Sequence, residues 1–117
     1  MKDYRSALDC LNKTNVLSNL NYDYLVLKVT CFKHLNQMDE AIRCCERANI
    51  VNGKEERAYF LKSECFYEIK SYEEALDAIN KALEIKPSFL PYEDLKNNIL
   101  RDQINYYIIT NGLKTLL

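Results

Sequence analysis

The sequence predicts an all-α fold in which antiparallel helix hairpins stack side by side. Only two glycines and two prolines interrupt the 117 residues, which is typical of helices joined by short connections. Apolar residues recur at spacings of three and four, as amphipathic helices require. The sequence also repeats itself with a period of 34 residues. A fixed period of this size is typical of a solenoid, in which each unit buries its apolar face against its neighbours.

The repeat is clearest in three helical segments that read "YRSALDCLN", "MDEAIRCCERAN" and "YEEALDAINKAL". Each carries an alanine at the same position, where a larger side chain would push two packed helices apart. Equivalent residues lie 34 positions apart: Tyr4, Met38 and Tyr72; Ala7, Ala41 and Ala75; Leu8, Ile42 and Leu76.

Helices are expected in chain order over residues 3–16, 22–35, 38–50, 55–69, 72–85 and 91–110. Asn52-Gly53 marks the break after the third helix. Ser71 with Glu74 predicts a capping box at the start of the fifth, and Pro87 lies just past its end. In the last helix, Pro91 suits the first turn and Asn111-Gly112 is expected to form the C-terminal cap.

These helices divide one domain, residues 1–117, into successive units. The expected units are a half repeat with only a second helix (1–21), two full repeats (22–55 and 56–89), a capping helix (90–110) and a tail (111–117). Leu8 and Leu11 of the half repeat lack a partner helix on one side, and such arrays need about three repeats for stability. We therefore expect a piece of a longer array, or completion by another chain at the N-terminal repeat or the last helix.

Composition excludes several classes of function. The formal charge is −1, with basic and acidic residues interspersed, so neither nucleic acid nor an anionic membrane is an expected partner. No signal peptide or apolar span of membrane length is visible. Five cysteines form an odd set without secretory context, which favours free thiols in a reducing, cytoplasmic location.

The cysteines and the single histidine indicate neither a metal site nor a catalytic site. The cysteines fall in repeat columns that need small apolar side chains, a role that cysteine fills well. His34 and Cys31 offer two ligands, whereas a structural zinc site wants four. Without a nucleophile elbow, a phosphate loop or paired carboxylates, we expect no enzyme, no cofactor and no metal.

The period and the residue sizes resemble the tetratricopeptide repeat, whose pattern is W-x2-L-G-x2-Y, then A-x3-F, then A, then P. The resemblance covers residues 1 to about 89 and implies a right-handed superhelix. In the third unit the pattern columns hold Tyr59, Lys62, Ser63, Phe66, Ala75, Ile79, Ala82 and Pro87. In the second unit they hold Leu25, Lys28, Val29, Phe32, Ala41, Cys45, Ala48 and Gly53. Lysine replaces leucine in both units, and Val29 stands where glycine or serine is usual.

In this family the first helix of each hairpin lines a concave surface along which partners lie. The resemblance therefore implies a peptide-binding groove formed by Asp23, Val26, Leu27, Thr30, His34, Arg57, Phe60, Leu61, Glu64 and Tyr67. Its apolar members, ringed by charges, favour a helix or an extended peptide with hydrophobic anchors. The alternative for Val26 and Phe60 is packing between hairpins.

One subgroup of the family grips the C-terminal carboxylate of heat-shock chaperones with lysines, asparagines and an arginine. Arg57 matches one basic column of that clamp, but Leu27 stands in place of the asparagine and Leu61 in place of the arginine. Leucine offers no charge-assisted hydrogen bond to a carboxylate. The unit "AYFLKSECFYEIKSYEEAL" nevertheless looks like those of co-chaperones, as it does like those of many adaptors.

The last helix carries two apolar stripes. The first contains Tyr92, Leu95, Ile99, Tyr106 and Ile109 and is expected to cover the third unit. The second contains Leu100, Ile104, Tyr107 and Ile108, a surplus that indicates a contact with a partner or another copy of the chain. The alternative is that the helix bends and tucks both stripes onto the array.

The predicted function is a protein–protein interaction scaffold or adaptor that binds a peptide or helix in the concave groove, with a co-chaperone as one version. The alternative is an architectural segment of a larger assembly without a separate ligand. RNA binding ranks third, because the chain lacks the basic surface that phosphate contacts need.

Overall fold

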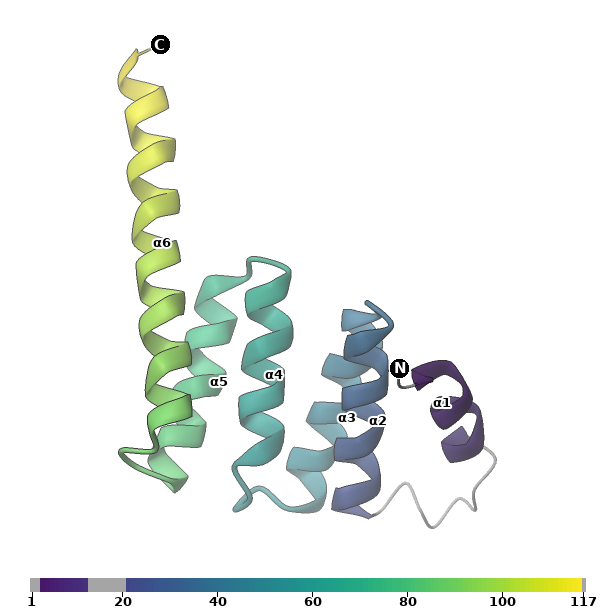
Figure 1. The fold of residues 1–117 in the computed structure, drawn as a ribbon. Helices are drawn as coiled ribbons and strands as arrows, with labels where there is room; N and C mark the ends of the chain where they lie inside the picture. The colour runs from purple at the N-terminus through teal and green to yellow at the C-terminus, as the bar shows by residue number, and fades with distance from the viewer. Residues whose placement is uncertain (1–2, 13–20, 117) are drawn as a thin grey trace.

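The computed structural model describes residues 3–12 and 21–116, with side chains up to residue 112 in the last helix. The helices are α1 (Tyr4–Asn12), α2 (Tyr22–His34), α3 (Met38–Val51), α4 (Arg57–Glu68), α5 (Tyr72–Ile85) and α6 (Leu90–Leu116). No strand occurs in these described ranges. The all-α prediction is confirmed, and the helices follow one another as hairpins along an extended array (Figure 1).

The helices form two layers. Helix α2 pairs with α3 and α4 pairs with α5, while α2 also contacts α4, and α4 contacts α6. As a result α2, α4 and α6 lie in one layer, and α3 and α5 lie behind them (Figure 1). We call the outer surface of the first layer the α2–α4–α6 face.

Both hairpins turn in the same way. Asn36 and Lys70, 34 positions apart, have φ values of 59° and 63°. In the first turn the Gln37 amide donates to the Phe32 carbonyl at 2.8 Å, and the equivalent bond in the second turn is 2.9 Å long. A left-handed residue enclosed by such a bond is a Schellman motif, which satisfies the last carbonyls of the preceding helix.

Small side chains fill the contacts between helices. Ala41, Ala48, Ala75 and Ala82 are fully buried, which confirms the predicted alanine stripe. Ala7 shares a repeat column with Ala41 but is exposed in the described part of the chain. Four of the five cysteines are buried as free thiols: Cys31, Cys44, Cys45 and Cys65.

The two lysines that depart from the repeat pattern are accommodated by aromatic neighbours. Lys28 is buried, and its ammonium nitrogen lies 5.6 Å from the centre of the Tyr24 ring. Lys62 lies in the same way over Phe66, at 6.0 Å. The aliphatic stems pack where leucine would, while the charged ends rest against ring faces.

One predicted helix end and one predicted cap are wrong. Asn111-Gly112 does not end α6, which continues to Leu116, because Gly112 does not adopt the positive φ of a C-terminal cap. The Ser71 side chain makes no capping hydrogen bond. Its ψ of 76° lies outside the extended region that aims a cap side chain at the helix amides. The predicted extension of the first helix to residue 16 falls outside the described residues.

No described helix is both long enough and apolar enough to cross a membrane.

Candidate functional site

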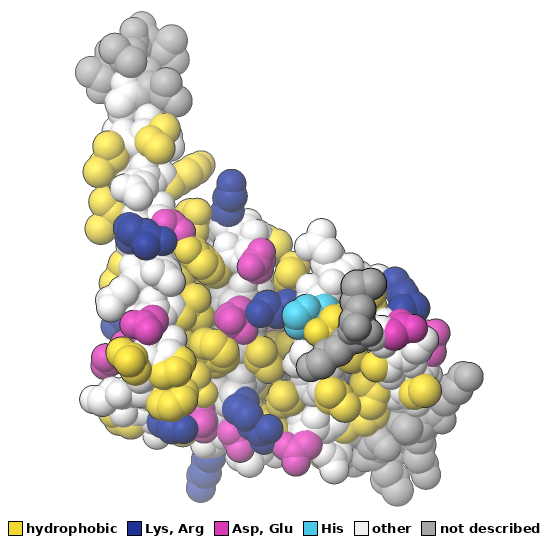
Figure 2. Space-filling view, viewed as in Figure 1, with side chains coloured by type: hydrophobic (Ala, Val, Ile, Leu, Met, Phe, Trp, Pro, Cys, Tyr) yellow, Lys and Arg dark blue, Asp and Glu magenta, His cyan; other side chains and the backbone are white. Residues whose placement is uncertain are grey.

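The predicted groove residues lie on α2 and α4 and share one face. None of them is buried: Asp23, Leu27, His34 and Arg57 are exposed, and the others are half-buried. On this face, hydrophobic side chains lie among interspersed acidic and basic ones (Figure 2). All ten residues are therefore at least partly accessible to a ligand.

The charge of Arg57 is already compensated within the chain. Its guanidinium lies 2.6 Å from a carboxylate oxygen of Asp23 and 3.2 Å from one of Glu55. It also sits over the Tyr22 ring, 5.2 Å from the ring centre. The hydrogen bonds that the guanidinium donates to these carboxylates, the one to Asp23 first, raise the pKa of Arg57. A carboxylate ligand would therefore meet a cation whose charge two carboxylates of the chain already offset.

Two further polar contacts tie neighbouring helices together across this face. Lys33 of α2 lies 2.9 Å from Glu64 of α4. The Tyr67 hydroxyl of α4 donates to the carboxylate of Asp102 on α6, and this bond lowers the pKa of Asp102. Arg101 lies 3.1 Å from the same carboxylate. The charges of the face are thus paired with each other.

The apolar residues of the face differ in what covers them. Phe60 stacks on Tyr92 of α6 with ring centres 4.8 Å apart, so it packs between hairpin and capping helix. Leu61 packs against the core cluster around Val29. Leu27 stays 51% exposed and is the most accessible apolar residue of the predicted groove.

The remaining predicted residues have local partners. The His34 ring stacks on Tyr4 of α1, with ring centres 4.1 Å apart and planes within 6°. The Thr30 hydroxyl donates to the Val26 carbonyl one turn earlier, at 3.2 Å. Helix α1 therefore borders one end of the face.

Sequence reasoning ended the groove at α4 and missed the contribution of α6. Tyr92 and Asp102 supply the ring under Phe60 and the acceptor for Tyr67. Part of the signal was present, because the same 34-residue shift carries the columns of Phe60 and Tyr67 onto α6 at Asp94 and Arg101, each within two residues of the contacting side chain. Lys33 was also missed, since it lies one residue outside the columns considered.

Tyr22 fixes the junction between α2 and α4. Its hydroxyl accepts a hydrogen bond from the Ala58 amide at 2.8 Å and donates to the Glu55 carbonyl at 3.4 Å. Burial raises the pKa of Tyr22 to about 12, and burial does the same for Tyr92.

We expect these two tyrosines to make the fold sensitive to alkali. The unfolded chain loses the phenolic protons near pH 10 and the folded chain near pH 12. The stabilisation that these protonated tyrosines give is therefore complete below pH 10 and is lost as the pH rises toward 12. In this range each tyrosine lowers the free energy of unfolding by up to about 1.4 kcal/mol for each pH unit. Urea unfolding at several alkaline pH values measures this decrease, and the free energy of unfolding of Tyr22→Phe should fall less steeply with pH. An equally steep fall in that variant would contradict the assignment.

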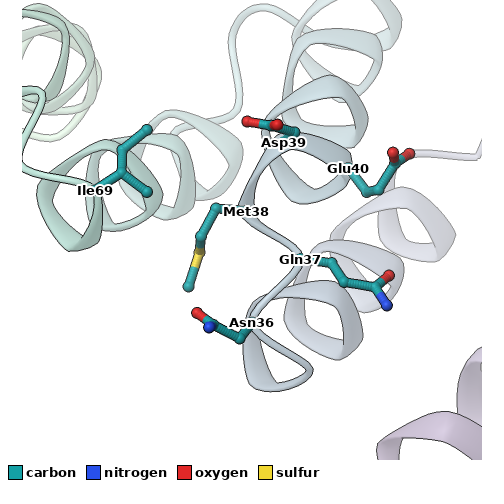
Figure 3. Close-up of a pocket in the computed structure, with 6 residues that line it drawn as sticks. All are labelled: Asn36, Gln37, Met38, Asp39, Glu40 and Ile69. Carbon is teal, nitrogen blue, oxygen red and sulfur yellow. The ribbon is translucent and has the colours of Figure 1, made fainter.

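Three cavities lie away from the predicted groove residues. The first, about 490 Å³, lies between the α2–α3 turn and the end of α4, with Met38 and Ile69 on its two sides (Figure 3). The second, about 440 Å³, is lined by residues of α3, α4 and α5, with Tyr59 and Phe66 from α4. The third, about 370 Å³, lies beside α6 and is lined by Lys70, Ser71, Tyr72, Glu73, Glu74, Gln103, Tyr106 and Tyr107.

The described residues contain no group of three histidine, cysteine or acidic side chains placed to hold a metal ion. Burial raises the pKa of the Cys44 and Cys45 thiols, and that of Cys65 to about 11. These thiols stay protonated near neutral pH, the form that suits core packing.

The two stripes predicted on the last helix are mostly uncovered in the second half of α6, although the Tyr106 ring lies 6.3 Å from that of Tyr72 on α5. Tyr106 and Ile109, which were expected to cover the third unit, are each 63% exposed. Ile104, Tyr107 and Ile108 of the second stripe are exposed as well, whereas Leu100 is half-buried. The alternative in which both stripes tuck onto the array is therefore wrong, because α6 runs past the end of the α4–α5 hairpin (Figure 1).

Comparisons with known proteins give one family and one fold. The sequence model of the family described as "Anaphase-promoting complex, cyclosome, subunit 3" matches residues 1–82. No curated protein sequence matches the chain.

Solved structures with the same fold are tetratricopeptide domains and a related chaperone. The first domain of Spaghetti (RPAP3), bound to the HSP90 peptide SRMEEVD, is 20% identical with a TM-score of 0.81, over 86% of this chain and 80% of that one. The Sgt2 domain from Aspergillus fumigatus is 18% identical with a TM-score of 0.81, over 89% and 70%. The Yersinia enterocolitica secretion chaperone SycD, in complex with a YopD peptide, is 21% identical with a TM-score of 0.77, over 86% and 82%.

Proposed function

The chain belongs to the anaphase-promoting complex, cyclosome, subunit 3 family and has the tetratricopeptide fold, and from this premise we propose that it is a protein-interaction scaffold. Its ligand is a peptide or helix that lies along the α2–α4–α6 face. The observation that carries the proposal is Leu27, half exposed beside charges that are already paired. A ligand side chain that covers Leu27 removes apolar surface from water.

The paired charges favour an apolar anchor over a free carboxylate. Arg57 already pairs with Asp23 and Glu55 at an exposed position, where a further ion pair with a ligand carboxylate adds little. The co-chaperone version of the proposal therefore ranks below a general adaptor. The HSP90 peptide SRMEEVD, which is bound to the Spaghetti domain, is the direct probe for it. We expect no saturable binding of this peptide in a fluorescence titration.

The test of the face is a single substitution, Leu27→Glu, with Ile50→Glu as the matched control. Ile50 lies on α3 and is 85% exposed, so both changes place a glutamate at an exposed apolar site. Leu61 is left intact because it packs against the core. In a pull-down from native lysate we expect Leu27→Glu to lose the proteins that wild type and Ile50→Glu retain. Removal of a buried anchor typically weakens binding at least tenfold.

Circular dichroism of both variants checks that the helices persist. If Leu27→Glu retains every protein that wild type captures, the face is not the binding surface. The chain is then better explained as an architectural segment of a larger assembly, and the exposed second half of α6 is the observation that favours this alternative.

We also propose a non-enzymatic role in the cytoplasm. The support is the set of buried free thiols, which suits a reducing compartment. The near-neutral charge argues for protein partners over nucleic acid or membrane.

A further inference from the structure

The cavity of about 440 Å³ lies between α3 and α5, on the side of α4 away from the predicted groove. We call it the α3–α5 pocket. Its volume is within the range of ligand-binding pockets. A helix turns by about 100° per residue, so Tyr59, Lys62 and Phe66, which line the pocket, point away from the groove residues Leu61 and Glu64 of the same helix. The α3–α5 pocket is therefore a second surface, formed by the layer of helices behind α4 (Figure 1).

Two aromatic rings of α4 line the pocket, and both are partly accessible. Tyr59 and Phe66 are half-buried, whereas Leu25, which occupies the column of Tyr59 one repeat earlier, is fully buried. The Phe66 ring already carries the ammonium group of Lys62, 6.0 Å from its centre. No cation of the described residues lies over the Tyr59 ring. Because the face of a tyrosine ring attracts cations, Tyr59 offers a contact for a cation from outside the chain.

Three carboxylates border these rings: Glu46 on α3, and Glu74 and Asp77 on α5. All three are exposed, and within the described part of the chain none of them makes an ion pair or a hydrogen bond. Of the two lysines in the pocket, one rests over an aromatic ring, and Lys81 lies 3.9 Å from Glu84, outside the pocket. Carboxylates thus outnumber ammonium groups, and this surplus beside an aromatic ring favours a cationic side chain.

The preceding repeat carries an arginine at a position where this pocket has an aspartate. The 34-residue shift aligns Glu40 with Glu74, and Arg43 with Asp77. Arg43 pairs with Glu40 across one turn of α3. On α5 the aspartate leaves Glu74 without such a partner and adds a second carboxylate one turn away. An arginine from another protein would supply the guanidinium that the chain itself provides in the preceding repeat.

We propose that the α3–α5 pocket binds an arginine side chain presented by a partner protein. The guanidinium lies against the Tyr59 ring and donates hydrogen bonds to Glu74 and Asp77, with Glu46 facing it from α3. A guanidinium suits these groups better than an ammonium group does, because it is planar, stacks on aromatic rings and donates in a fork that matches carboxylates. Since the pocket and the groove lie on opposite sides of α4, the chain can hold both partners at once.

The first arm of the test is an NMR titration of the isotope-labelled full chain with N-acetyl-arginine methylamide, a blocked arginine. We expect the amides of Tyr59, Asp77 and Ala78 to shift toward saturation, with a dissociation constant on the order of millimolar, as suits one side chain. Blocked lysine at the same ionic strength controls for general attraction and should bind about fivefold more weakly. Blocked leucine should leave these amides unchanged, because it offers the carboxylates no donor.

The second arm uses Asp77→Arg, which gives α5 the counterpart of Arg43. The new guanidinium should pair with Glu74 and fill the site, so blocked arginine should bind at least about tenfold more weakly. Arginine is a better helix former than aspartate, and circular dichroism checks that the fold persists. Asp77→Asn removes the charge with little change of shape and should also weaken binding. Asp94→Arg, the same change at an exposed site on α6, is the matched control and should bind like wild type.

Several results would overturn the proposal: no saturable shift, equal binding of blocked lysine, shifts confined to the α2–α4–α6 face, unchanged binding in both Asp77 variants, or equal loss in Asp94→Arg. Saturation by blocked leucine would overturn it too, because an apolar side chain would then be the ligand. Tighter binding of free than of blocked arginine would do the same, in favour of an amino acid. Leu27→Glu should leave the titration unchanged, so this test is independent of the proposed groove.

Discussion

Replacing Ile99 with alanine is expected to lower the free energy of unfolding by about 2–5 kcal/mol. Ile99 is fully buried on α6 and belongs to a cluster with Ala75, Ile79, Ala82 and Tyr92. Removing its side chain leaves a cavity at the contact between α6 and α5, and the rigid helices around it can relax only in part. Urea unfolding followed by circular dichroism measures the loss.

The matched control for this prediction is Ile109→Ala on the same helix. Ile109 is 63% exposed, so in the monomer its truncation should change the free energy of unfolding by less than about 0.5 kcal/mol. Both variants must be compared at a concentration where the chain is monomeric. Equal effects of the two substitutions would mean that α6 is not anchored through Ile99.

Replacing Ala75 with leucine is expected to cost about 1–3 kcal/mol, and more if the hairpin cannot open. Ala75 is fully buried, and its carbonyl accepts a hydrogen bond of 2.7 Å from the buried Ser63 hydroxyl of α4. The two helices are therefore in close contact at this point, and a leucine side chain would push them apart. The melting temperature should fall by about 4 °C or more.

The control is Ala7→Leu, which makes the same change in the same repeat column. Ala7 is exposed in the described part of the chain, so the added side chain meets no packed helix there and stability should stay within about 0.5 kcal/mol of wild type. A comparable fall in both variants would indicate an effect of leucine on helix stability in general, and the close-contact explanation would be wrong.

The repeat period predicted the parts of the fold that depend on burial. Ala41 and Ala75 are both fully buried, and so are Cys31 and Cys65 to within 2% exposure, because equal columns meet equal surroundings in successive hairpins. The local signals at Ser71 and Gly112 failed, since capping depends on backbone angles that tertiary packing decides.

The candidate site was predictable in position but not in its contacts. Asp23 and Arg57 share a repeat column, and neighbouring hairpins place equal columns side by side, so their ion pair could be read from the sequence. The link from Tyr67 to Asp102 depends on how α6 is placed against α4, which the period alone does not give. The groove itself and the division into repeats stay predictions.

Packing between neighbouring helices also determines how the chain gains and loses its structure. Almost every helix contact joins elements adjacent in the sequence or one hairpin apart, so contacts close short loops of chain and folding needs few distant encounters. The α4–α5 hairpin is supported from both sides, whereas α1 and the far end of α6 are supported from one side or none. Amide protection therefore follows a gradient from the middle outward, and unfolding begins at the ends while the central hairpin still stands.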